Sequence, residues 1–215
     1  MKTGKSIYII LQMAIGLLFV NLHTWSQSKQ AESEIDKKVN DFLKKQASMW
    51  RDMNVPATDG KLLYDIIMEN KYKSAVEIGT STGHSSIWLA WALSKNGGKL
   101  ITFEIDERRY KEALSNFEKA GLSNYIDARL GDAHDLVAKL NEPIDFVFSD
   151  ADKDWYTNYF KALDPWLLVG GCFTAHNIEM SGAREFYEYI SNLPNYKTMV
   201  DNRGAGMSIS YKTGK

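Results

Sequence analysis

Two stretches in the second half of the chain carry side chains that can do chemistry. The run Asp-Phe-Val-Phe-Ser-Asp-Ala-Asp-Lys closes one predicted strand and supplies Asp150 and Lys153. The run Gly-Gly-Cys-Phe-Thr-Ala-His-Asn closes the next predicted strand and supplies His176 and Asn177. Oxygen and imidazole ligands from neighbouring loops can hold a divalent cation, so Asp150, His176 and Asn177 are candidate metal ligands. The plainer interpretation is that they cap helices and form turns.

A glycine-bearing turn follows the first predicted strand. The run Val-Glu-Ile-Gly-Thr-Ser-Thr-Gly-His-Ser includes Gly79 and Gly83, which let the backbone pass close to a ligand without a Cβ in the way. The spacing differs from the G-x-G-x-x-G of dinucleotide-binding folds, and the turn lacks the lysine of a phosphate loop. This turn suits a ligand that has adenosine but no pyrophosphate, although such turns are usually structural.

Two acidic residues follow the next two predicted strands. Glu104 ends Ile-Thr-Phe-Glu, where a carboxylate can accept hydrogen bonds from both hydroxyls of a ribose. Asp132, in Gly-Asp-Ala, can accept a hydrogen bond from an adenine amine or cap the helix that begins at Ala133. Ligands of open α/β sheets bind beyond the carboxyl ends of the strands, so all these residues are expected at one edge of the sheet.

Taken together, these motifs resemble the cation-dependent O-methyltransferases that include the catechol and caffeoyl-CoA enzymes. The resemblance runs from about Met53 to the C-terminus, and the run ending in Asp150 and Lys153 is its most specific part. It implies an enzyme that transfers a methyl group from S-adenosylmethionine to a hydroxyl of a small phenolic or catecholic molecule. It also implies cofactor contacts at Val55, Glu77, Gly79, Ser81, Gly83, Ser85, Glu104, Asp132, Ala133 and Asp150.

The resemblance assigns catalytic roles with one departure. It implies that Asp150 is a metal ligand bordering the cofactor and that Lys153 is a general base or a charge stabiliser. The family has Asp-Asn where this chain has His176-Asn177, so one carboxylate ligand is replaced. The family metal is Mg²⁺, but an imidazole ligand favours a softer ion such as Mn²⁺, Fe²⁺ or Zn²⁺. Alternatively no metal binds and His176 is the catalytic base.

The elements that must position these residues alternate between strands and helices. This pattern predicts an α/β fold with a doubly wound, mostly parallel seven-stranded sheet, an antiparallel edge strand and extra N-terminal helices. Apolar residues between Ile35 and Met53 share one helical face and predict a helix before Pro56. The expected strands cover 75–79, 99–104, 125–130, 144–149, 172–175, 196–200 and 207–211, and the expected helices cover 84–93, 107–120, 133–140, 155–163 and 183–192.

The N-terminus indicates a leader. Lys2 and Lys5 precede a short apolar run over 7–20, a pattern typical of a secretory signal peptide. We therefore expect a signal peptide over 1–26 and a methyltransferase domain over 27–215, with an N-terminal helix in 27–55 and the core in 56–215. Cleavage of this leader implies an exported protein without stable membrane insertion. One alternative is that residues 7–20 remain as a membrane anchor. The other is that the start is misassigned and the protein is cytoplasmic.

Net charge and composition limit the classes of partner to expect. The formal net charge of −1 becomes −3 without residues 1–26, which gives no electrostatic reason to expect a nucleic-acid partner. A small-molecule substrate is expected, and the resemblance adds a homodimer. Three other functions stay open: a catalytically silent cofactor- or metal-binding module, an NAD-type oxidoreductase, and a methyltransferase acting on a modified RNA base. The lone cysteine, Cys172, excludes an intrachain disulfide.

Overall fold

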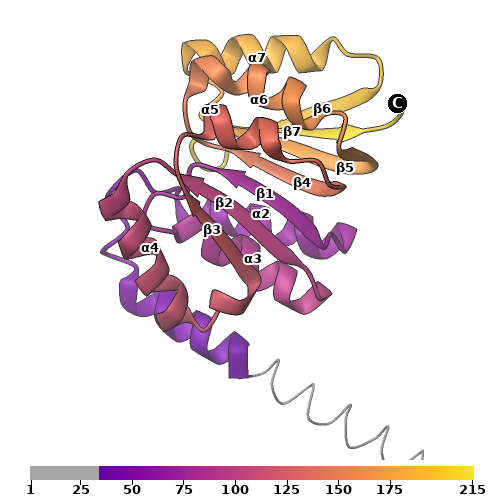
Figure 1. Ribbon diagram of the computed structural model, residues 1–215. Coiled ribbons are helices and arrows are strands. Elements are labelled where there is room, and N and C mark those ends of the chain that lie inside the picture. Colours follow the sequence, from indigo (N-terminus) through magenta and orange to yellow (C-terminus); the bar gives the residue numbers. More distant parts are fainter. Residues whose placement is uncertain (1–33) are drawn as a thin grey trace, which may run out of the picture.

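The computed structural model describes residues 34–215, and the predicted leader lies outside this range. One seven-stranded sheet runs through the molecule in the order β3-β2-β1-β4-β5-β7-β6 (Figure 1). β7 is antiparallel to both of its neighbours, and the other pairings are parallel. The doubly wound fold is confirmed, but the antiparallel strand lies inside the sheet, between β5 and the edge strand β6.

The strands agree with the alternating sequence pattern. Five consecutive connections return the chain to the same sheet by way of a helix, as buried parallel strands require. The strands are β1 (Ser74–Ile78), β2 (Lys99–Glu104), β3 (Ile126–Leu130), β4 (Ile144–Ser149), β5 (Leu167–His176), β6 (Tyr196–Asp201) and β7 (Met207–Lys212). The helices are α2 (Ala57–Asn70), α3 (His84–Asn96), α4 (Glu107–Ala120), α5 (Ala133–Leu136), α6 (Tyr156–Leu163) and α7 (Ser181–Ser191), preceded by a helix over 34–46.

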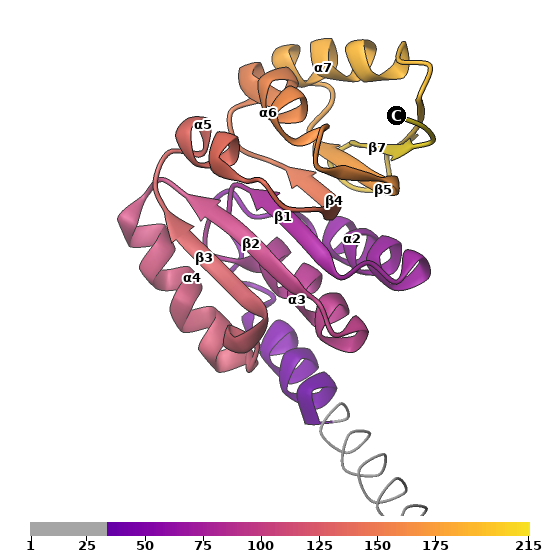
Figure 2. The same ribbon diagram turned by 45° about the vertical axis from the view of Figure 1, so that its right-hand side comes forward.

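Helices cover both faces of the sheet (Figure 2). One apolar cluster joins the sheet to α2, α3, α4 and the helix over 34–46, which contributes Val39 and Phe42. A second cluster joins the opposite face to α5, α6 and α7. Because the strand order reverses between β1 and β4, a crevice is expected beyond the carboxyl ends of these two strands.

The fifth strand is longer than predicted. It begins at Leu167, and its pairing with β4 shifts so that Ile144 faces Leu167 while Phe146 faces Cys172. A bulge of this kind, with Gly170 at φ +87°, lets the strand bend without breaking the sheet. The Gly-Gly pair therefore lies within β5, and His176 becomes the last strand residue rather than the first loop residue.

The predicted N-terminal helix is shorter than the apolar pattern indicates. It ends at residue 46, and the chain then crosses the end of the sheet as an irregular segment, residues 47–56. Trp50 stacks on His84 at the start of α3, with ring centroids 4.6 Å apart. Met53 has φ +52°, a left-handed conformation that a continuing helix cannot contain. The packing of Trp50 against His84 thus prevails over the helical spacing of the apolar residues, and the helix ends before residue 50.

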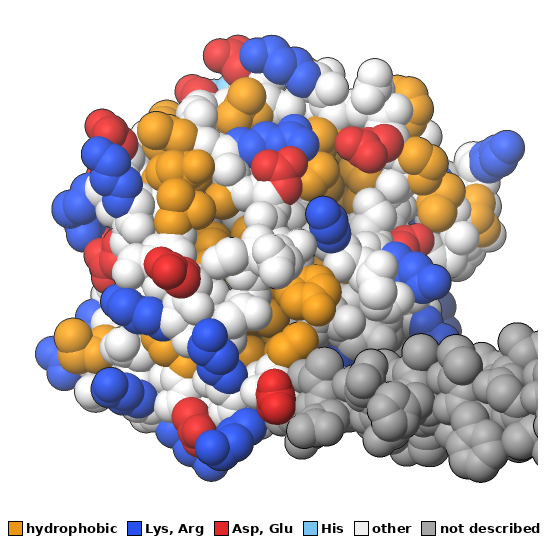
Figure 3. Space-filling model, turned by 60° about the horizontal axis from the view of Figure 1, so that its bottom comes forward, with side chains coloured by type: hydrophobic (Ala, Val, Ile, Leu, Met, Phe, Trp, Pro, Cys, Tyr) orange, Lys and Arg blue, Asp and Glu red, His pale blue; other side chains and the backbone are white. Residues whose placement is uncertain are grey.

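The outer surface carries charges of both signs. On the face shown in Figure 3, basic and acidic side chains are interspersed with small apolar areas. None of the helices among residues 34–215 has the length and apolar character needed to cross a bilayer.

Two left-handed glycines flank α3 and offer a matched comparison. At Gly83, φ +96°, an added Cβ would lie 2.5 Å from Cε1 of Phe117 on α4, whereas at Gly97, φ +71°, it would meet nothing within 4 Å. We expect Gly97→Ala to lower the free energy of unfolding by roughly 1 kcal/mol through backbone strain. Gly83→Ala should lower it by about 1–3 kcal/mol more, because the ring must move. Urea unfolding measures both, and equal losses would contradict this packing.

Candidate active site

A cavity of about 660 Å³ opens beyond the carboxyl ends of the central strands. The loops after β1, β2, β3, β4 and β5 all contribute to it, as the topology requires. The structure brings most of the sequence-predicted residues to its wall: Gly79, Ser81, Glu104, Asp132, Ala133, Asp150, Lys153, His176 and Asn177.

The remaining predicted cofactor residues lie behind this wall. Val55, Glu77, Gly83 and Ser85 are not among the residues that line the cavity, and Glu77 is fully buried. Direct cofactor contacts from these four residues stay a prediction. Their observed contacts support the turn after β1. The glycine-bearing run therefore contains residues that shape this turn as well as residues that line the cavity.

The turn after β1 is held by backbone contacts. Gly79 has φ +103°, and a Cβ there would lie 2.8 Å from the carbonyl oxygen of Asp150, so only glycine allows this close approach. The Ser81 N–H donates to Oε2 of Glu104 at 2.7 Å, and the Asp106 N–H donates to Oε1 at 2.9 Å. Two backbone donors therefore fix the carboxylate of Glu104 at the cavity wall.

Beside Glu104 the cavity has an apolar face that the sequence analysis missed. Ile105 lines the cavity and leaves 67% of its surface exposed. An apolar side chain of this size directly after a strand-end carboxylate fits a planar base next to a ribose. The sequence signal is an isoleucine in a polar turn, which by itself has little specificity.

Asp132 caps a helix, as one of its two interpretations proposes. Its carboxylate accepts the backbone N–H of His134 at 2.9 Å at the start of α5. The imidazole of His134 lines the cavity and stacks on Trp155, with centroids 3.8 Å apart. An additional bond from Asp132 to an adenine amine stays a prediction.

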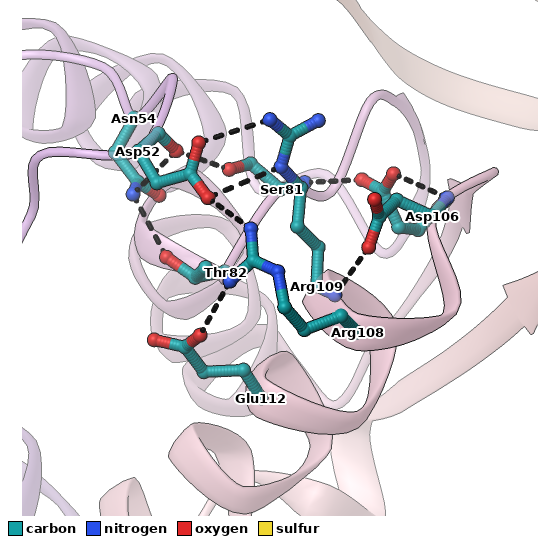
Figure 4. Close-up of polar contacts among 9 residues, drawn as sticks. Asp52, Asn54, Ser81, Thr82, Asp106, Arg108, Arg109 and Glu112 are labelled. Atoms are coloured by element: carbon teal, nitrogen blue, oxygen red, sulfur yellow. Dashed lines mark hydrogen bonds and ion pairs between the residues drawn. The ribbon is translucent and has the colours of Figure 1, made fainter.

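The segment over 47–56 closes one side of the cavity. The carboxylate of Asp52 pairs with Arg109 at 2.9 Å and with Arg108 at 2.6 Å, and these hydrogen bonds lower its pKa (Figure 4). Asn54 donates to Oγ1 of Thr82 at 2.8 Å. Met53, between these two anchors, lines the cavity.

At the other end of the cavity four charged groups form a line. Nζ of Lys153 lies 2.7 Å from Oδ1 of Asp150, and Oδ2 of Asp150 lies 3.1 Å from Nδ1 of His176. Nε2 of His176 lies 2.8 Å from Oδ2 of Asp59, which also accepts the backbone N–H of Ala205 at 3.0 Å. These contacts thus connect α2, the loop after β4 and the end of β5.

Burial and charge oppose each other in this line. His176 and Asp59 are only 3% and 2% exposed. Burial alone would lower the pKa of His176, but the carboxylate of Asp150, 3.1 Å away, and that of Asp59, hydrogen-bonded to Nε2, outweigh burial and raise that pKa to about 9. Burial alone would raise the pKa of Asp59, but the bonds from His176 and Ala205 lower it. The two carboxylates therefore favour the charged form of the ring.

Whether the predicted metal ligands hold a divalent cation stays a prediction. Nε2 of His176 is hydrogen-bonded to Asp59, whereas its Nδ1 lies 3.1 Å from Oδ2 of Asp150 and is buried without a hydrogen-bond partner. The other carboxylate oxygen of Asp150 pairs with Lys153. Within residues 34–215, no group of three or more His, Cys, Asp or Glu side chains is arranged to hold a metal ion.

Asp59 is the functional candidate that sequence reasoning missed most completely. In the sequence it is an acidic residue in the first turn of a helix, a common place for a carboxylate. It lies 117 positions from its partner His176, so no local spacing links them. Only the packing of α2 against the end of β5 reveals the pair.

Beneath the turn, Glu77 is a buried acid with polar neighbours. Its Oε2 accepts hydrogen bonds from the hydroxyls of Ser86 and, at 2.6 Å, Thr102. Burial raises the pKa of Glu77 to about 7 despite these bonds. The carboxyl is therefore largely protonated below neutral pH.

Comparisons with known proteins agree with this geometry. A family model described as "O-methyltransferase" matches residues 26–186. The chain is 40% identical over 138 residues to a catechol O-methyltransferase of Niastella koreensis, covering 60% of each chain. It is 35% identical over 140 residues to caffeoyl-CoA O-methyltransferase 2 of Petunia hybrida, covering 62% of this chain and 57% of the relative. The alignments thus span about three fifths of these relatives.

Solved structures extend the likeness to most of the fold. An O-methyltransferase from Bacillus cereus in complex with SAH superposes with a TM-score of 0.71 at 28% identity, covering 82% of this chain and 91% of the other. The O-methyltransferase TomG from Streptomyces achromogenes in complex with SAM superposes with a TM-score of 0.70 at 25% identity, covering 82% and 90%.

Glu77 makes stability depend on pH in a defined window. Between the ordinary pKa of 4.5 and about 7, the folded state binds a proton that the unfolded state has lost, so rising pH destabilises the fold through this group. The loss reaches roughly 3 kcal/mol above pH 7. Glu77→Gln cannot titrate, so its free energy of unfolding relative to wild type should rise from pH 5 to pH 7 and then level off. Urea unfolding at several pH values tests this, and parallel curves would contradict it.

Proposed function

We propose that this chain, which belongs to the O-methyltransferase family whose model it matches, transfers a methyl group from S-adenosylmethionine to a hydroxyl of a small phenolic molecule. The single observation that carries the proposal is the shared cavity, whose wall includes Glu104, Asp150 and Lys153. The SAH and SAM complexes of solved relatives support the methyl donor. The names of the curated relatives support a phenolic acceptor.

The donor end of the cavity has the chemistry that a nucleoside with an amino-acid tail requires. Glu104 would accept the ribose hydroxyls, and Ile105 would contact one face of the adenine. The close backbone approach at Gly79 leaves room for the part of the ligand that joins the ribose to the amino-acid end. Bound there, S-adenosylmethionine supplies an electrophilic methyl group on a positively charged sulfur.

The acceptor end has the chemistry that a phenolic oxygen requires. Lys153 Nζ and Nδ1 of His176 both lie beside the carboxylate of Asp150, at 2.7 Å and 3.1 Å. Positive charge near a hydroxyl lowers its pKa and favours the anionic oxygen, which is the stronger nucleophile. Because Lys153 pairs with Asp150, we assign it to stabilising that oxygen. In the transfer the O–C bond to the methyl group forms as the S–C bond breaks, the donor leaves as SAH, and the hydroxyl proton passes to solvent.

Binding and turnover are tested separately. Calorimetric titration with S-adenosylmethionine and SAH measures donor binding, and labelled methyl transfer to catechol and caffeoyl-CoA measures acceptor use. Binding of both ligands with transfer to a phenolic hydroxyl supports the proposal. Donor binding with no transfer to any hydroxyl acceptor would indicate a catalytically silent module, and binding of NAD in place of the donor would indicate an oxidoreductase.

Glu104 is expected to determine affinity for the donor. Glu104→Ala removes hydrogen bonds to a charged acceptor and should raise the Kd of S-adenosylmethionine by about 10- to 100-fold. Glu107→Gln, an exposed acid on α4 paired with Lys111, is the matched control and should leave the Kd unchanged. Equal affinities of wild type and Glu104→Ala in calorimetry would contradict this role.

Lys153 is expected to act on turnover rather than on donor binding. Lys153→Met removes one stabilising charge from the developing oxyanion and should lower kcat by about 100- to 1,000-fold. The Kd of S-adenosylmethionine should change little, because the lysine lies at the acceptor end. Lys139→Met, an exposed lysine outside the cavity, is the control. Retention of full kcat in Lys153→Met would remove the lysine from the mechanism.

A further inference from the structure

His84, the first residue of α3, has a hydrogen-bond partner at each ring nitrogen. Its Nδ1 lies 2.8 Å from the backbone carbonyl oxygen of Val55, and its Nε2 accepts the indole N–H of Trp88 at 3.2 Å. A carbonyl oxygen can only accept and an indole N–H can only donate, so Nδ1 carries a proton and Nε2 carries none. The two partners therefore fix the ring as one neutral tautomer.

The surroundings of this ring offer no counter-ion for a positive charge. His84 is 3% exposed, and burial lowers its pKa below the ordinary value of 6.5, although the bond to Val55 opposes this effect. The charged and titratable groups on the elements packed against the start of α3 have partners of their own: Asp36 has Lys95, Asp52 has Arg108 and Arg109, Asp59 has His176, Lys61 has Asp65, and Glu77 has Ser86 and Thr102.

The same ring supports the segment over 47–56. Trp50 stacks on it, and Nε1 of Trp50 is buried with no hydrogen-bond partner in the described part of the chain, so no hydrogen bond replaces the stacking if the ring moves. Val55, near the other end of the segment, is held through its carbonyl oxygen. Met53 lies between these two contacts and lines the cavity.

A second proton on this ring would break the arrangement. Protonated Nε2 would set its N–H against that of Trp88, 3.2 Å away, and would add a buried charge without a partner. The π face of Trp50 attracts a positive ring, but this contact replaces neither the lost acceptor nor the lost solvation. A charged ring is therefore expected to leave its place, which releases both ends of the segment.

We propose that His84 is a positioning residue for S-adenosylmethionine, which holds the segment over 47–56 at the donor only while its ring is neutral. The ring is not part of the cavity wall, so it acts through Trp50 and Val55, which set the place of Met53. This inference rests on the donor-binding half of the proposed function and is independent of the methyl acceptor.

The first experiment measures the Kd of SAH by calorimetry from pH 4.5 to pH 8, over the range in which circular dichroism shows a folded protein. In wild type the Kd should rise as pH falls below the pKa of His84, approaching about tenfold per pH unit, because the ligand binds the neutral form. His84→Gln cannot take up this proton, so its Kd should be up to about tenfold higher at pH 8 and should lack the rise. Parallel pH profiles of wild type and His84→Gln would overturn the inference.

The second experiment changes the partner of Nε2 and leaves the histidine in place. Trp88→Phe removes the N–H that opposes protonation, so the rise in Kd should move to higher pH. Trp91→Phe is the matched control: it lies on the same helix, but its indole N–H donates to Asp36 at 2.6 Å, so the wild-type profile should remain. A shift in both variants, or in neither, would contradict the assigned tautomer.

The third experiment observes the ring directly and needs no ligand. Long-range proton–nitrogen NMR at pH 7 should show Nδ1 of His84 protonated and Nε2 unprotonated. In Trp88→Phe the same ring should become doubly protonated at a higher pH than in wild type. A proton on Nε2 of the wild-type ring at pH 7 would overturn the inference, even if His84→Gln fails to fold.

Failure of this inference can be told apart from failure of the proposed function. If SAH binds with the expected pH profiles but no acceptor is methylated, the proposed function fails and the role of His84 stands. If methyl transfer is observed but the Kd of SAH does not follow the protonation of His84, the proposed function stands and this inference fails.

Discussion

The acceptor end of the site depends on the line of alternating charges from Asp59 through His176 and Asp150 to Lys153. Asp59 and His176 are buried, so removing either one leaves its partner without compensation in a region of low dielectric. Because the four residues come from α2, from β5 and from the loop after β4, the same contacts that balance charge also hold these elements together.

The two ends of the cavity are organised by different means. At the donor end, backbone geometry dominates: Gly79 permits the approach of two loops, and N–H groups of Ser81 and Asp106 aim the carboxylate of Glu104. At the acceptor end, side-chain charge dominates. Donors fixed before reaction stabilise developing charge without a cost of reorganisation.

The irregular segment over 47–56 links the N-terminal helix to this site. Trp50 anchors it on the apolar side by stacking on His84, and Asp52 anchors it on the polar side through two arginines (Figure 4). The arginine pairs are partly exposed and contribute modestly to stability. The stacking of Trp50 on His84 therefore keeps Met53 at the cavity wall, and the ion pairs of Asp52 mainly fix the direction of the segment over 47–56.

The sequence by itself determined the order of strands and helices, the parallel sheet and the residues that follow the strands, because hydrophobic periodicity and turn residues are local signals. It predicted that Glu104, Asp150 and Lys153 lie at one edge of the sheet, since strand ends of a doubly wound sheet converge, and all three line one cavity. It could not give the bulge in β5 or the end of the first helix at residue 46, which depend on packing. Only the tertiary structure revealed the partner of His176, because the carboxylate of Asp59 that contacts it belongs to a distant helix.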